Sequence, residues 1–447
     1  PAETGAVTIA MPQDVQAEVF DWPVELFRKR VWHVRRPVPE PAALQRAVAL
    51  IKTAKRPLII AGGGTIYAGA SEELRALATA TGIPVGDTQA GKGAINFDHP
   101  SAVGGVGSTG CDSGNHIADK ADLIIGVGTR YSDFTTASKT QFKNPDVKFV
   151  NINVTPFDAA KESAEMVVAD AREALAALAE ALADYRVDAA YSEEIAAEKE
   201  AWLKATERCY HLDHGPLPAQ TEVFGALNEL MGEEDVVINA AGSMPGDLQA
   251  LWQARSPLQY HVEYAFSCMG YEVPAAMGVK LARPEAEVVS IVGDGTYQML
   301  PMELATVVQE NIKVIYVLLQ NYGFCSIGAL SESHGSQRFG TKYRRRGEGS
   351  HLADEQVIDG IDIAANARSW GLDVLEVHTI AEFKEAYRQA EASDRPTMIH
   401  IETDLYGPNP PGSSWWDVPV SGVSELESTQ RAYEEYLRDR KPQRHYL

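Results

Sequence analysis

The sequence has few cysteines, and their arrangement argues against two kinds of cross-linked protein. Four cysteines occur in 447 residues, and no two of them form a C-x-x-C pair. Neither a zinc site built from paired cysteines nor a disulfide scaffold is therefore indicated. A reducing compartment is the simplest setting for such a chain, so we expect a cytoplasmic protein.

Long apolar runs and an excess of positive charge are also absent. No apolar run approaches the roughly 18 residues that span a bilayer, so we expect no membrane partner. Asp and Glu number 62 against 40 Lys and Arg, which gives a formal net charge of -22. Such a charge disfavours nucleic acid as the main partner, because the phosphate backbone attracts Lys and Arg. The composition fits a metabolic protein.

Strand and helix patterns alternate along most of the chain. Short apolar runs typical of buried strands occur in two groups, at 57–61, 83–85, 122–128 and 147–152, and at 235–239, 288–292, 313–319, 373–377 and 397–402. Alternation with helical segments predicts doubly wound parallel sheets. Because 447 residues exceed one compact core, we predict an α/β protein with two such domains.

The predicted domains have the following boundaries. A central α/β domain covers 35–190, a second α/β domain covers 206–405, and a tail covers 406–447, with a helix near 424–438. Residues 6–10 have a strand pattern, yet one strand cannot pair its own backbone groups. We therefore expect residues 1–34 to be the C-terminal remnant and linker of a further domain.

The strongest chemical signal joins two successive strands of the second domain. The run Val288–Val292 ends in Gly293-Asp294-Gly295, a helix is predicted over Pro301–Glu310, and the next strand ends at Asn321. In such a unit the strands are parallel, and if adjacent their ends lie about 5 Å apart. A lone Gly-Asp-Gly is often a simple tight turn. Paired with Asn321, however, Asp294 offers the hard oxygen ligands that Mg²⁺ prefers, and the glycines allow close approach to a diphosphate.

These residues resemble the cofactor motif of the thiamine-diphosphate enzymes, the superfamily of acetolactate synthase and pyruvate decarboxylase. The resemblance implies that Asp294, the Asn321 side chain and the Gly323 carbonyl bind Mg²⁺. It also implies that Gly293, Gly295, Thr296 and Asn321 contact thiamine diphosphate. Gln320 departs from the pattern, since many relatives have a second Asn there.

A second part of the resemblance is the run Ser267–Glu272. By this match Met269 supports the bent shape of the cofactor, and backbone groups of Ser267 and Met269 hold its pyrimidine ring. Taken alone, Met269 fits a gap-filling core residue equally well. The superfamily's activating Glu lies on the N-terminal pyrimidine domain, so neither Glu263 nor Glu272 is assigned that role. We expect the chain alone to show no turnover.

Longer runs resemble one narrower family, the 3D-(3,5/4)-trihydroxycyclohexane-1,2-dione hydrolases of inositol catabolism. They are 322–328, 330–333, 335–341, 362–368 and 414–421. This resemblance implies hydrolytic C–C cleavage of a polyol-derived cyclic 1,2-dione to 5-deoxy-glucuronate, in a homodimer or homotetramer.

Two alternatives remain open on the sequence. One is another thiamine-diphosphate reaction, such as acetolactate-type carboligation or 2-oxoacid decarboxylation. The other is a non-catalytic, nucleotide-binding regulator derived from the fold. The run Gly62-Gly63-Gly64 lacks the spacing of a dinucleotide motif, and whether FAD binds the central domain is left open.

Overall fold

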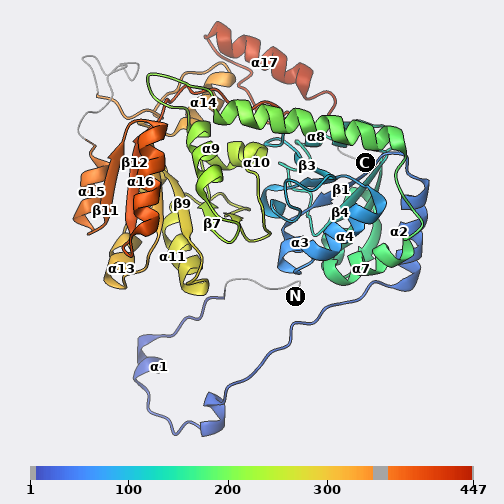
Figure 1. Cartoon of the computed structure of the whole chain (residues 1–447), viewed down its shortest axis with the longest axis horizontal. Coiled ribbons are helices and arrows are strands. Elements are labelled where there is room, and N and C mark those ends of the chain that lie inside the picture. The colour runs from blue at the N-terminus through green and yellow to red at the C-terminus, as the bar shows by residue number, and fades with distance from the viewer. Residues whose placement is uncertain (1–6, 346–360, 445–447) are drawn as a thin grey trace.

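The computed structural model describes residues 7–345 and 361–444. Within them two six-stranded sheets lie side by side, each flanked by helices (Figure 1). Neighbouring strands run parallel throughout both sheets. The predicted α/β class with two parallel sheets is confirmed.

The first sheet has the strand order β3-β2-β1-β4-β5-β6. Its strands are β1 (Pro57–Ala61), β2 (Val85–Asp87), β3 (Ala102–Gly105), β4 (Leu123–Val127), β5 (Lys148–Asn153) and β6 (Glu165–Val168). The two edge strands, β3 and β6, were not predicted. Each has only four residues, and β3 reads Ala-Val-Gly-Gly, so neither carries a strong strand pattern.

The second sheet has the order β11-β12-β10-β9-β7-β8. Its strands are β7 (Val236–Asn239), β8 (Tyr260–Val262), β9 (Val288–Gly293), β10 (Ile315–Gln320), β11 (Asp373–Val377) and β12 (Thr397–Glu402). The three-residue β8 was missed by the sequence analysis. Along β10, Ile315, Val317 and Leu319 pack in one core, while Tyr316 and Leu318 pack in another. This period of two explains why the central strands are apolar on both faces.

The helices that connect the strands are mostly short. The α-helices are α1 (Gln13–Ala17), α2 (Pro41–Thr53), α3 (Gly63–Tyr67), α4 (Ser71–Thr81), α5 (Asp112–Lys120), α6 (Pro156–Ala159), α7 (Ala171–Ala181), α8 (Ala189–Tyr210), α9 (Gln220–Leu230), α10 (Met244–Leu251), α11 (Glu272–Ala282), α12 (Asp294–Tyr297), α13 (Glu303–Gln309), α14 (Cys325–Ser333), α15 (Ile363–Ser369), α16 (Ile380–Ala392) and α17 (Glu427–Asp439). The 3-10 helices are η1 (Val24–Phe27), η2 (Gln89–Gly91) and η3 (Lys161–Ser163). The helix predicted over Pro301–Glu310 is the shorter α13, and one turn, α12, precedes it.

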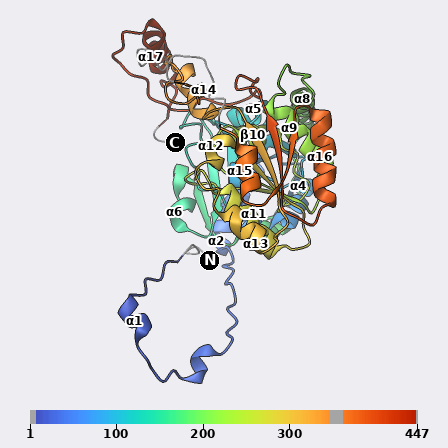
Figure 2. The ribbon, with the colours of Figure 1, turned by 90° about the vertical axis from the view of Figure 1, so that its left-hand side faces the viewer.

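Residues 7–34 lie away from both sheets (Figures 1 and 2). The strand predicted at 6–10 is wrong for the described residues 7–10, which belong to no strand of either sheet. Val7 and Ile9 are 85% and 79% exposed. Without a neighbouring strand edge, an apolar pattern alone cannot form a strand.

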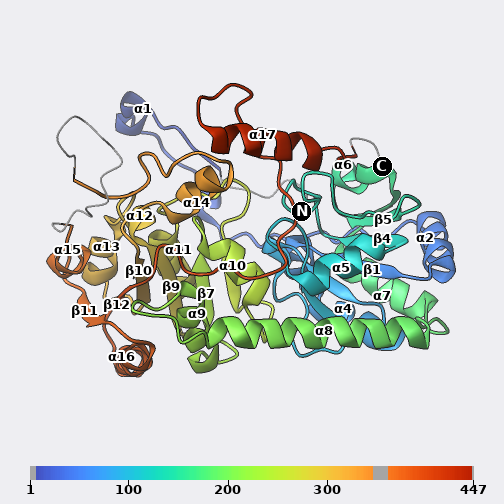
Figure 3. The same cartoon turned by 90° about the horizontal axis from the view of Figure 1, so that it is seen from above.

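The long helix α8 and the C-terminal tail connect the two halves of the molecule. Helix α8 packs on α5 and β3 in the first half and on α9 and α10 in the second (Figure 3). Its residue Trp202 is buried, and the indole Nε1 donates to the Ala250 carbonyl at 2.8 Å. The tail returns from the second half to the first, where Trp416 Nε1 donates to Asp133 at 2.7 Å.

Candidate cofactor-binding site

The carboxyl ends of β9 and β10 bring the two predicted ligand residues together. These strands are direct neighbours, with Leu319 opposite Gly293. Asp294 and Asn321 follow them, and the Asn321 amide donates to Asp294 Oδ2 at 3.2 Å. The juxtaposition expected from the parallel crossover is therefore present.

Backbone amides hold the Asp294 carboxylate in place. Oδ2 also accepts from the amides of Tyr322 at 2.6 Å and Gly323 at 3.3 Å, and Oδ1 accepts from Gly295 at 2.8 Å. The side chain is 1% exposed. Burial raises the pKa of Asp294 to about 6, and the amide bonds oppose that rise. A cation at this position would favour the charged form.

Asn321 supplies an oxygen that lacks a partner. Its Oδ1 is buried, and no group of the described chain donates a hydrogen bond to it. An orphaned buried acceptor is costly unless a ligand satisfies it. Like the neighbouring Asp294 carboxylate, this oxygen is of the hard type that a magnesium ion prefers.

The glycines of the motif serve tight packing as much as ligand approach. A Cβ at Gly295 would lie 2.8 Å from the Phe324 ring, and one at Gly323 would overlap the Thr341 carbonyl oxygen. A Cβ at Gly293 would meet only Met244 Cε, at 3.4 Å. The missing side chain at Gly295 thus accommodates the Phe324 ring, whereas Gly293 has more open space beside it.

The second predicted segment lies beside the first. The Gly270 amide donates to Thr296 Oγ1 at 2.8 Å and to Glu272 at 3.1 Å, which ties the turn after Met269 to α12. Ser267 has a left-handed backbone, with φ of 50°. Such a conformation is uncommon for a residue with a side chain, so the turn has a fixed, specific shape.

Glu263 and Glu272 accept hydrogen bonds from backbone amides of neighbouring loops. Glu272 is fully buried and accepts from the amides of Ala241 and Gly270 and from the Thr296 hydroxyl. Glu263 accepts from the Cys268 amide at 2.7 Å. Both carboxylates thus order the loop around Met269.

One cavity of about 700 Å³ is lined by every predicted site residue. These residues are Ser267, Met269, Gly293, Asp294, Gly295, Thr296, Asn321 and Gly323. Residues from the first half of the chain, among them Gln89, Thr109 and Phe134, and Trp416 of the tail also line it. None of these four was predicted as a site residue: no local motif marks Gln89, Thr109 or Phe134, and Trp416 lies in the family-specific run 414–421 without an assigned role.

A hydrogen-bonded group on the cavity wall was also missed. Ser243 Oγ donates to Gln220 Oε1 at 3.0 Å, and Gln220 Nε2 donates to Asp247. All three residues line the cavity. Burial raises the pKa of Asp247 to about 7, so this carboxyl can hold or release a proton near neutral pH.

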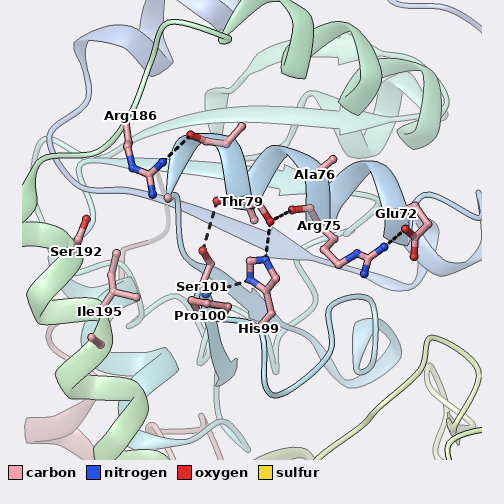
Figure 4. A pocket seen from close by; sticks show the side chains of 14 residues that line it. Glu72, Arg75, Ala76, Thr79, His99, Pro100, Ser101, Arg186, Ser192 and Ile195 are labelled. Carbon is pink, nitrogen blue, oxygen red and sulfur yellow. Dashed lines mark hydrogen bonds and ion pairs between the residues drawn. The ribbon is translucent and has the colours of Figure 1, made fainter.

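A second hollow, of about 790 Å³, lies between α4, the His99 loop and α8 (Figure 4). The Ser101 amide donates to His99 Nδ1 at 3.1 Å, so Nε2 carries the proton and donates to Thr79 Oγ1 at 2.9 Å. Thr79 in turn donates to the Arg75 carbonyl. This chain of bonds satisfies its own polar atoms, so it does not indicate a ligand as the orphaned Asn321 oxygen does.

Three other features of the described residues bear on function: the glycine run, possible metal clusters and possible membrane-spanning helices. The run Gly62–Gly64 packs on the Gly128 loop, where a Cβ at Gly62 or Gly64 would overlap backbone atoms, so packing accounts for these glycines. No three His, Cys, Asp or Glu side chains in 7–345 and 361–444 are placed to share a metal. The predicted magnesium site contains only one side chain of those types. No helix in the same residues is long and apolar enough to cross a bilayer.

Comparison with known proteins identifies the family. Residues 44–178 match the model of the thiamine pyrophosphate enzyme central domain, and residues 240–401 match that of the C-terminal TPP binding domain. The 3D-(3,5/4)-trihydroxycyclohexane-1,2-dione hydrolase of Bacillus cereus is 43% identical over 470 residues, covering 100% of this chain and 73% of that protein.

The enzymes of the same name from Bacillus anthracis and Bacillus thuringiensis are 42% and 43% identical, with the same coverage. The chain therefore belongs to the thiamine pyrophosphate enzymes and, within them, to the family of 3D-(3,5/4)-trihydroxycyclohexane-1,2-dione hydrolases.

Proposed function

We propose that this protein hydrolyses the bond between the two carbonyl carbons of 3D-(3,5/4)-trihydroxycyclohexane-1,2-dione in myo-inositol catabolism. The product is the open-chain acid 5-deoxy-glucuronate. The names of the relatives support the substrate. The observation that carries the cofactor chemistry is the orphaned Asn321 oxygen beside the Asp294 carboxylate.

The predicted residues divide into two roles. Asp294, the Asn321 side chain and the Gly323 carbonyl would hold Mg²⁺. Gly293, Gly295, Thr296 and Asn321 would border thiamine diphosphate, and Ser267 and Met269 would hold its pyrimidine ring. The chemistry that the bound cofactor supplies is a nucleophilic carbon and an electron sink for the C–C bond that breaks.

The protein's own residues position the reactants and control protons. Residues from both halves of the chain line the cavity, so the packing of the two halves positions the groups around the substrate. Asp247 can hold a proton on its carboxyl near neutral pH. Gln220, bonded to both Asp247 and Ser243, fixes the direction in which that carboxyl faces.

Oligomeric state and compartment complete the proposal. Phe266, Met299 and Met302 are large apolar side chains with exposures of 86%, 54% and 58%. Such side chains favour burial against another subunit, which supports a homodimer or homotetramer. The four cysteines are all unpaired, which supports the reducing cytoplasm.

The test combines binding and turnover. Calorimetry should show that thiamine diphosphate binds only with Mg²⁺, and that Asn321→Ala weakens this binding at least about tenfold. Gln309→Ala, on the exposed end of α13, is the matched control. The protein expressed from its whole reading frame should cleave the cyclic dione and leave pyruvate unchanged. Pyruvate consumption without dione cleavage would instead establish the carboligase or decarboxylase.

A further inference from the structure

Arg338 places a buried cation in the wall of the cofactor cavity. Its side chain is only 9% exposed. The guanidinium lies over the Tyr406 ring, 4.6 Å from its centroid, and Nε donates to Glu332 at 2.8 Å. These two contacts fix the plane of the guanidinium and leave its outer nitrogens for other partners.

One of those outer nitrogens is unsatisfied. Nη1 of Arg338 is buried and donates to no acceptor in the described chain. The Cys325 side chain lies near Arg338, but a thiol sulfur is only a weak acceptor. A buried guanidinium N–H without an acceptor is costly, which indicates that a ligand oxygen completes the site.

Arg338 is an isolated cation among the carboxyl groups that line the cavity. Among the described residues that line it, Arg338 is the only Lys or Arg, whereas Asp247, Glu263, Asp294 and Asp404 contribute carboxyl groups. Among the described lining residues, Arg338 is therefore the one that can pair with an anion. The fork of Arg338 suits the two oxygens of a carboxylate.

The proposed reaction generates such an anion. Hydrolysis breaks the bond between the two carbonyl carbons and transfers the OH of water to one carbon and the H to the other. One carbon becomes a carboxylic acid and the other an aldehyde, without an oxidant or reductant. The acid then loses its proton to solvent near neutral pH.

We propose that Arg338 binds the carboxylate group of this product and the negative charge that develops on the same oxygens during its formation. This inference rests on the proposed function. The segment that carries Arg338 is bonded to the loop after β10, through Phe324 N to Thr341 O and Tyr343 N to Tyr322 O, each at 2.7 Å. Arg338 is thereby fixed relative to Asn321 and Gly323.

The experiment measures anion preference by calorimetry, with the protein loaded with Mg²⁺ and thiamine diphosphate. The probes are D-glucuronate and its uncharged counterpart D-glucose. The unchanged protein should bind glucuronate more tightly than glucose. Arg338→Gln should reduce that preference about tenfold or more, and should change the thiamine-diphosphate Kd by less than about twofold.

Two further variants complete the experiment, one as a matched control and one as a conservative substitution. Arg388→Gln, on the exposed face of α16, should leave both measurements unchanged. Arg338→Lys retains the positive charge but lacks the forked guanidinium group. It should therefore stay folded, and its preference for glucuronate over glucose should be several-fold smaller. It replaces the Gln variant if that one unfolds.

Three results would overturn the inference. They are an unchanged protein without preference for glucuronate, a preference that neither Arg338 variant reduces, and a loss confined to thiamine-diphosphate affinity, which would assign Arg338 to the diphosphate. Failure of the proposed function is separate. It would appear as absent dione cleavage by the unchanged protein with its glucuronate preference intact.

Discussion

At the residue scale, the charge of Asp294 distinguishes a metal ligand from a structural carboxyl. Its two oxygens accept four backbone amides, so an aspartate here would order the loop even without a cation. A neutral amide of the same shape keeps one of the two acceptor oxygens. A substitution that removes only the charge of Asp294 therefore distinguishes metal binding from ordering of the loop.

Asp294→Asn should weaken Mg-dependent binding of thiamine diphosphate at least about tenfold, because the amide lacks the charge that a divalent cation requires. Calorimetry measures the affinity, and thermal unfolding shows whether the loop stays ordered. Asp184→Asn, an exposed residue paired with Lys52, is the control. Equal affinities for the two variants would exclude Asp294 as a ligand.

Asp247 makes a prediction about pH. Its pKa rises to about 7 in the folded protein, against about 4 when unfolded. The folded state therefore binds the proton more tightly, and the stability this provides is present below pH 4 and lost as the pH rises to about 7. The thiols of Cys209 and Cys325 are the other titratable groups that interact with it.

Asp247→Asn should remove this dependence. The unfolding free energy of the unchanged protein should fall relative to that of the variant by up to roughly 1.4 kcal/mol per pH unit between pH 5 and 7. Above pH 7 the difference should level off. Denaturant unfolding at several pH values measures it. A constant difference from pH 5 to 8 would contradict the burial of a titrating carboxyl.

At the scale of elements, the turn between β9 and α12 requires a glycine at position 295, because no space is left for a side chain. Gly295→Ala should lower stability by about 1–3 kcal/mol, because its Cβ would meet the Phe324 ring at 2.8 Å. Gly278→Ala in α11 is the matched control, since a Cβ there meets nothing within 4 Å. The control should be neutral or stabilising by about 0.5–1 kcal/mol. Chemical denaturation compares the two.

The parts of the site on successive strands could be predicted from the sequence, since a parallel crossover fixes where strand ends meet. Asp294 and Asn321 were placed together in this way. The walls contributed by Gln89, Thr109 and Trp416 could not be predicted, because they arrive by packing between distant parts of the chain. Strand β8 was missed because three residues show no reliable alternation.

At the scale of the whole molecule, the tail attaches the second half to the first. Trp416 contacts the Phe134 ring at a centroid distance of 5.0 Å and bonds to Asp133. Trp416→Ala should therefore destabilise the protein by about 1–2 kcal/mol. Trp32→Ala, at a residue that is 85% exposed, should have no effect in the same thermal unfolding experiment. Identical melting curves for the two variants would show that the attachment is weak.

Helix α8 sets how the two halves are spaced. Its 22 residues give a helix of roughly 33 Å that packs on α5 and β3 in one half and on α9 and α10 in the other. One added residue in its middle would rotate everything beyond it by about 100°, and Trp202 could no longer face Ala250. The length of this helix therefore sets the distance between the two halves whose residues together line the cavity.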